Sequence, residues 1–212
     1  MAAGRYLLVV EGKDDKYVIE NLWKRHSSQA ILPFEIKPED GVDKLLLNLR
    51  VRLKPTDEDA ALQRLGIVVD ADADLDARWQ ALCDILTKLG YANAPTQPEP
   101  NGTIIQQDEH PVVGIWVMPN NQLPGILEDF IKFLIPPGDL LLGRVKDCVQ
   151  QIPEQERRFP AERLSKVHVH TWLAWQEEPG KPLGQAITAR YLDAHSPHAQ
   201  QLMDWVRRLF DL

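Results

Sequence analysis

The chain has 212 residues, of which 44% are hydrophobic and 26% are charged, the balance of an ordinary globular protein with a substantial core. Its formal net charge of −7 argues against a protein that coats nucleic acid by electrostatic attraction alone. Neither an apolar run of about 20 residues nor a signal-peptide pattern is present, so we expect a cytoplasmic protein with no membrane partner. Cys83 and Cys148 are the only cysteines, and we expect both to be reduced thiols.

The first half of the chain alternates short apolar runs with helical patterns, which is typical of an α/β fold. Pro55 should open a short helix within this part. From the N-terminus, the other elements we predict are a strand at 7–10, a helix at 14–26, a strand at 34–37, a helix at 43–53, a strand at 67–69, a helix at 77–89, a pair of strands at 103–107 and 112–118, and a helix at 126–134.

The second half of the chain has a helical pattern throughout. After the prolines at 136 and 137, the predicted helices span 139–151, 160–175, 183–194 and 198–210. We therefore predict an α/β core at 1–135 and a helical extension at 136–212, packed on the core as one compact unit with no separable linker.

Carboxylates follow two of the predicted buried strands directly. Glu11 and Asp15 follow the first strand, and Asp70 and Asp72 follow the strand at 67–69. The carboxyl ends of strands form the ligand-binding edge of an α/β sheet, and strand alternation points Asp70 and Asp72 the same way if the extended backbone continues that far. Clustered carboxylates repel one another unless a divalent cation neutralises them, and such hard oxygen ligands select Mg²⁺ or Mn²⁺. The pattern predicts a metal site for phosphate chemistry.

The motif Glu11-Gly12-x-x-Asp15 followed by Asp70-x-Asp72 resembles the signature of the Toprim domain, which primases, topoisomerases, recombination mediators and the overcoming-lysogenization-defect nucleases share. The runs at 114–121 and 127–130 extend the similarity to a small group of bacterial Toprim-like proteins of uncharacterised function, related to those nucleases. The resemblance implies a mainly parallel sheet with helices on both faces.

The resemblance also implies roles for particular residues. Glu11, Asp70 and Asp72 would hold Mg²⁺ for strand cleavage or nucleotidyl transfer, with Glu11 as ligand or general acid–base. Asp15 belongs to the motif, but it could instead only stabilise the start of the helix. In the nuclease branch a further acid downstream completes a two-metal site, and Glu128 is its counterpart here, unless it is simply an acid favoured in the first turn of a helix.

Phosphoryl transfer also needs a cation to offset charge on the scissile phosphate. Lys13 is our candidate by its place in the first motif, with Lys166 and Lys181 as alternatives and a surface lysine as the plain interpretation. Asn120 and Asn121 could orient a phosphate or could only form a turn.

The sequence thus predicts a Mg²⁺-dependent phosphotransfer protein, and we expect a nuclease that acts on DNA or RNA. One alternative is a non-catalytic metal- or nucleic-acid-binding regulatory module of a defence or repair system, where an ATPase would be the partner protein. The other is a hydrolase of a small phosphorylated metabolite. An oligomer is compatible with each of these.

Overall fold

Three long apolar strands form the centre of the sheet in the computed structural model, which describes residues 5–27, 31–53 and 62–212. They are β1 (Tyr6–Val10), β3 (Arg64–Asp70) and β5 (Val112–Met118), and they run parallel. Almost all of their residues are buried. A parallel strand that is covered on both faces needs apolar side chains on both, which explains the continuous apolar runs.

Two short strands complete a five-stranded sheet in the order β2-β1-β3-β5-β4. β2 (Glu35–Pro38) runs parallel to β1, whereas β4 (Thr103–Ile105) pairs antiparallel with β5. Short edge strands limit pairing with other chains. Three of the four strand pairs are parallel, which confirms the predicted mainly parallel sheet.

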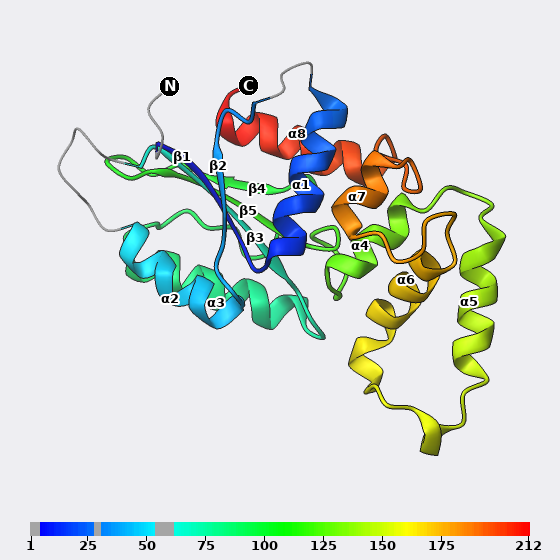
Figure 1. The fold of residues 1–212 in the computed structure, drawn as a ribbon. Helices are drawn as coiled ribbons and strands as arrows, with labels where there is room; N and C mark the ends of the chain where they lie inside the picture. Colours follow the sequence, from blue (N-terminus) through cyan, green and yellow to red (C-terminus); the bar gives the residue numbers. More distant parts are fainter. Residues whose placement is uncertain (1–4, 28–30, 54–61) are drawn as a thin grey trace.

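Helices cover both faces of the sheet, as predicted (Figure 1). On one face α2 (Val42–Arg52) and α3 (Leu75–Lys88) pack on Leu7, Val9 and the side chains of β3 and β5 that share their orientation. On the other face α1 (Lys13–His26), α7 (Leu183–Thr188) and α8 (Pro197–Phe210) belong to a cluster that includes Leu8 and Val10. The other helices span Leu127–Leu134 (α4), Leu140–Gln150 (α5) and Leu164–Ala174 (α6).

Two predicted helices are longer than those observed. The helix predicted at 183–194 ends at Thr188, because Arg190 has a φ of 64°, a left-handed conformation that an α-helix does not continue through. The helix predicted from 160 begins at Leu164, after the 3₁₀ turn Ala161–Arg163. The short helix predicted near Pro55 lies outside the described residues.

The last helix packs directly on the sheet because two glycines make room for it. Gly66 and Gly114 are register partners on β3 and β5, and Leu209 of α8 lies over both. Phe210 stacks on Phe34 with ring centroids 4.4 Å apart. The C-terminal part of the chain therefore contributes to the same core as the strands.

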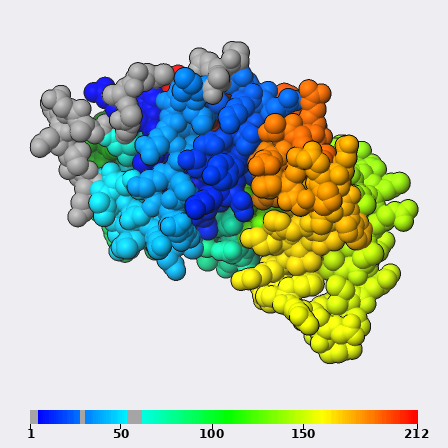
Figure 2. Space-filling view, in the orientation of Figure 1, coloured from blue at the N-terminus to red at the C-terminus, as the bar shows by residue number. Residues whose placement is uncertain are grey.

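The segment that contains α5 and α6 extends from one end of the molecule, beyond α4 (Figure 2). Within the described residues, no helix combines the length and the apolar character needed to cross a membrane.

We expect Gly114→Ala to lower the free energy of unfolding by about 1–3 kcal/mol, the usual cost of overpacking a core. An added Cβ would lie 2.6 Å from one methyl carbon of Leu209, which is buried and cannot turn into solvent. Urea denaturation of both proteins measures the difference.

Gly143→Ala in α5 is the matched control. Gly143 is exposed and nothing lies within 4 Å of an added Cβ, so this change should raise stability by about 0.5–1 kcal/mol, as expected in a helix. Equal stability of Gly114→Ala and the wild type would contradict the packing role of the glycine pair.

Candidate functional site

The predicted acidic residues lie at the carboxyl edge of the parallel strands. Glu11 directly follows β1, Asp70 is the last residue of β3, and Glu128 lies in the first turn of α4. Oε1 of Glu11 accepts a hydrogen bond from the backbone N–H of Asp70, with a distance of 2.9 Å. This bond joins the ends of two neighbouring strands and fixes both residues at the edge.

The carboxyl of Asp70 has a pKa well above its ordinary value. Burial is the main cause, and the negative charges of Asp15, Glu11, Asp72 and Glu128 raise the pKa further. Its Oδ1 is buried and has no hydrogen-bond partner among the described residues. The structure thus brings all five predicted metal ligands close enough to interact electrostatically.

Asp15 stabilises the start of α1, one of the two roles that the sequence left open, and its role as a metal ligand stays a prediction. Its Oδ2 accepts a hydrogen bond from the N–H of Gly12 at 3.0 Å, which caps α1. Its side chain is also buried, and burial together with Glu11 and Glu128 raises its pKa to about 7, against the opposing effect of the Gly12 N–H. Burial likewise raises the pKa of Glu11, although the Asp70 N–H and Arg78 oppose the shift.

The extended backbone of β3 ends at Asp70, two residues before Asp72. Asp72 has a φ of 55°, so strand alternation no longer applies there and the condition for expecting Asp70 and Asp72 to point the same way is not met. Its Oδ2 accepts a hydrogen bond at 2.6 Å from Arg78, whose Nε donates to the Asp70 carbonyl at 2.9 Å. Arg78 was missed from the sequence, since nothing in its spacing from Asp70 and Asp72 marks it as their partner.

Glu128 is buried and lies in contact with two side chains of α6. Its Oε1 is 3.2 Å from Nζ of Lys166 and 3.6 Å from Nε2 of His170. Burial alone would raise the pKa of Glu128, but the interactions with His170 and Lys166 outweigh it and lower the pKa. Glu128 is therefore held as a carboxylate.

Lys166, rather than Lys13, is the lysine that contacts the acidic cluster. Lys13 is exposed at the first position of α1, and its catalytic role stays a prediction. The spacing of four between Lys166 and His170 puts both on one face of a helix, and this signal could have identified the pair.

The two asparagines after β5 form the turn there. Oδ1 of Asn121 accepts a hydrogen bond from the N–H of Val117 at 2.7 Å, and Oδ1 of Asn120 accepts one from the N–H of Leu123 at 3.0 Å. These contacts occupy the side-chain oxygens of both residues.

The acidic cluster is not arranged as a coordination shell. Among the side chains that the structure describes, no three from Asp, Glu, His and Cys are placed so that they could hold one metal ion together. Asp72 is engaged by Arg78 and Glu128 by Lys166, which leaves Asp70 with the unpartnered oxygen.

A family model described as "Protein of unknown function (DUF3226)" matches residues 5–211, which is nearly the whole chain. No curated protein and no solved structure gives a match.

We expect Asp15→Asn to raise the free energy of unfolding of the metal-free protein more at pH 8 than at pH 5. The two increases should differ by about 1–3 kcal/mol, because one pKa unit corresponds to about 1.36 kcal/mol. The pKa of Asp15 is raised from 3.8 to about 7 in the folded state, so the folded protein binds more protons than the unfolded chain between these values. Wild-type stability therefore falls as the pH rises from about 4 to about 7, and asparagine removes this loss while keeping an oxygen for the Gly12 N–H.

Urea denaturation in the presence of a chelator at both pH values measures the effect. Asp14→Asn is the control, because Asp14 is the exposed neighbour in the same turn. Its free energy of unfolding should differ from that of the wild type by the same small amount at both pH values. An equal effect of Asp15→Asn at pH 5 and pH 8 would refute the raised pKa.

Proposed function

We propose that this chain, which belongs to the family whose model it matches, is a divalent-metal-dependent phosphotransfer protein, and specifically a nuclease acting on DNA or RNA. The observation that carries the proposal is the buried, unpartnered Oδ1 of Asp70 among four further carboxylates. A buried polar atom without a partner is costly, and a cation is the partner that such a cluster favours.

The acidic cluster fits Mg²⁺ or Mn²⁺ by its chemistry. All five side chains offer hard oxygen atoms, and three of them, Glu11, Asp15 and Asp70, have raised pKa values that a nearby divalent ion would lower again. Glu11 and Asp70 would hold the ion, and water molecules would complete its coordination. Asp15, Asp72 and Glu128, the other predicted ligands, would join them only after their side chains moved, because no three of these acids are placed to hold one ion in the described structure. When bound, a divalent ion would supply Lewis-acid stabilisation of phosphoryl oxygens.

The residues around the cluster would bind and orient the substrate phosphate. Lys166 is half-exposed beside Glu128, so its ammonium can also reach a phosphate that approaches this edge. His170 lies beside the same oxygen of Glu128 that Lys166 contacts. Arg78 holds Asp72 and the Asp70 carbonyl, and thereby positions the segment after β3.

The resemblance of Glu11-Gly12-x-x-Asp15 and Asp70-x-Asp72 to the Toprim signature supports the same assignment and favours nucleic acid as substrate. The net charge of −7 means that affinity for nucleic acid without the metal should be weak.

We expect millimolar Mg²⁺ or Mn²⁺ to raise the melting temperature of the wild type, because a ligand that binds only the native state stabilises it. Each kcal/mol of stabilisation by the bound ion should raise the melting temperature by about 2–4 °C in a chain of this size. Asp70→Asn should abolish the shift and slightly raise the melting temperature without metal, since it removes a buried acid that other carboxylates repel.

Asp76→Asn is the control for this measurement. Asp76 lies exposed in the first turn of α3 and should keep the full metal-induced shift. Absence of any shift in the wild type at millimolar metal would rule out the metal site.

The catalytic part of the proposal is tested with a labelled oligonucleotide. Glu11→Gln should reduce metal-dependent cleavage by more than about 100-fold, because it removes charge from the site but keeps the oxygen that accepts the Asp70 N–H. Lys166→Ala should reduce cleavage by about 10–100-fold and Lys13→Ala by less, since only Lys166 contacts the cluster.

Lys181→Ala controls for the loss of a lysine, because Lys181 pairs with Glu178 after α6. Tight metal-independent binding of DNA, with no cleavage under any divalent ion, would contradict the nuclease proposal and favour a binding module. Inertness towards both DNA and RNA would leave the hydrolase of a small phosphorylated metabolite.

A further inference from the structure

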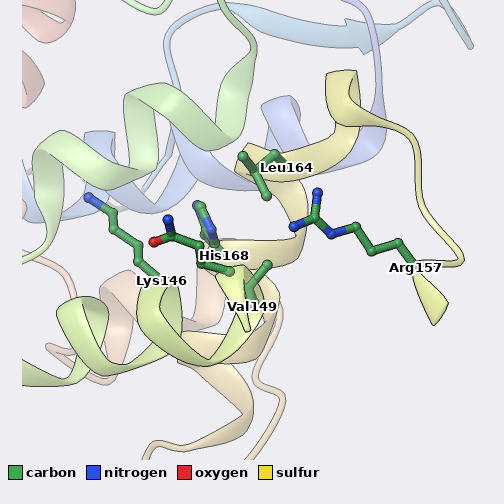
Figure 3. A pocket seen from close by; sticks show the side chains of 6 residues that line it. Lys146, Val149, Arg157, Leu164 and His168 are labelled. Atoms are coloured by element: carbon green, nitrogen blue, oxygen red, sulfur yellow. The ribbon is translucent and has the colours of Figure 1, made fainter. Parts of the chain in front are cut away.

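A cavity of about 310 Å³ lies between α5 and α6, in the part of the chain that projects beyond α4 (Figure 3). This volume is at the small end of the range for ligand pockets. The lining side chains come from α5, from α6 and from the segment that joins them: Lys146, Val149, Gln150, Arg157, Leu164 and His168.

The cavity is separate from the acidic cluster because it uses the opposite face of α6. Leu164 and His168 are one turn apart and line the cavity, whereas Lys166 and His170 contact Glu128. Side chains two positions apart on a helix point about 200° from each other. The same helix therefore serves two different sites.

The charge of the cavity suits an anion. Lys146 and Arg157 both line it, and no carboxylate does. Lys146 forms no ion pair with any residue that the structure describes. Within the same residues, the side chain of Arg157 makes one hydrogen bond, from its Nε to the Ile152 carbonyl at 3.1 Å. That bond fixes the stem of Arg157, and in Figure 3 its guanidinium points toward the other lining residues. Its two terminal nitrogens remain free for a bidentate contact with phosphate.

The rest of the cavity suits a flat, partly apolar group. Val149 is buried, and Leu164 and the ring of His168 complete an apolar wall. Burial lowers the pKa of His168, and the positive charges of Lys132 and Lys146 lower it further against the opposing effect of Asp129. The imidazole is therefore neutral near pH 7, and can stack on an aromatic ring or exchange hydrogen bonds with it.

We propose that this cavity binds a nucleotide, with the phosphate held by Arg157 and Lys146 and the base packed on Val149, Leu164 and His168. A phosphate alone would leave the apolar wall in water, and an uncharged base would leave both cations without a partner. The small volume fits one nucleotide unit, which can be a free nucleotide or one residue of a single strand.

The test is a calorimetric titration of the full chain with AMP, in the presence of a chelator and without divalent ions. We expect one saturable site, with adenosine and inorganic phosphate each at least about tenfold weaker, a difference of about 1.4 kcal/mol. Arg157→Ala and Lys146→Ala should each weaken AMP binding at least tenfold. Because no metal is present, the result does not depend on the proposed nuclease activity.

Arg158→Ala is the matched control, since Arg158 is the exposed neighbour of Arg157 and does not line the cavity. The Arg158→Ala change should leave the affinity for AMP within about twofold of the wild-type value. Absence of saturable AMP binding, or an equal loss in Arg158→Ala and Arg157→Ala, would overturn the proposal, the latter because it reveals attraction by net charge alone.

Competition with a short single-stranded oligonucleotide then identifies the source of the nucleotide. If the cavity holds one residue of a strand, the oligonucleotide should displace AMP and its affinity should fall in Arg157→Ala. If the ligand is a free nucleotide, AMP binding should persist in the presence of the oligonucleotide.

Discussion

Mutual repulsion among five carboxylates at one edge of the sheet is the constraint on which the surrounding structure depends. Asp70 and Glu11 are fixed there by the strands themselves, through the bond from the Asp70 N–H to Glu11. The apolar strands are buried over almost their full length, so these acids cannot move away without disrupting the core. The remaining elements have to compensate the charge.

Compensation takes two physical forms. Asp72 and Glu128 are paired with cations, Arg78 from α3 and Lys166 from α6. Asp70 and Asp15 pair with no cation among the residues that the structure describes, and burial raises their pKa values and so favours their protonated forms. Stability is thus reduced at this edge, as is common where a site is organised for binding rather than for folding.

Helix α6 connects this edge with the rest of the C-terminal region. Ser165 of α6 donates a hydrogen bond to Asp129 of α4, and Lys132 of α4 contacts both residues. These contacts hold α6 against α4, with Lys166 and His170 toward Glu128 and His168 toward the cavity beside α5. A nucleotide bound between α5 and α6 would therefore contact the same helix that supplies the cation of the acidic cluster.

The sequence by itself determined the α/β class, the mainly parallel sheet and the delivery of Glu11 and Asp70 to its edge, because these follow from local apolar runs that end in acids. Only the tertiary structure decided the partner of Asp72, which has a left-handed backbone conformation after β3 and accepts a hydrogen bond from Arg78. It also decided that Lys166 meets Glu128 and that Lys146, Arg157 and His168 share a cavity, because these contacts join helices and loops distant in the chain. Local patterns fix which residues a strand or helix presents, whereas the partners of those residues depend on how the elements pack.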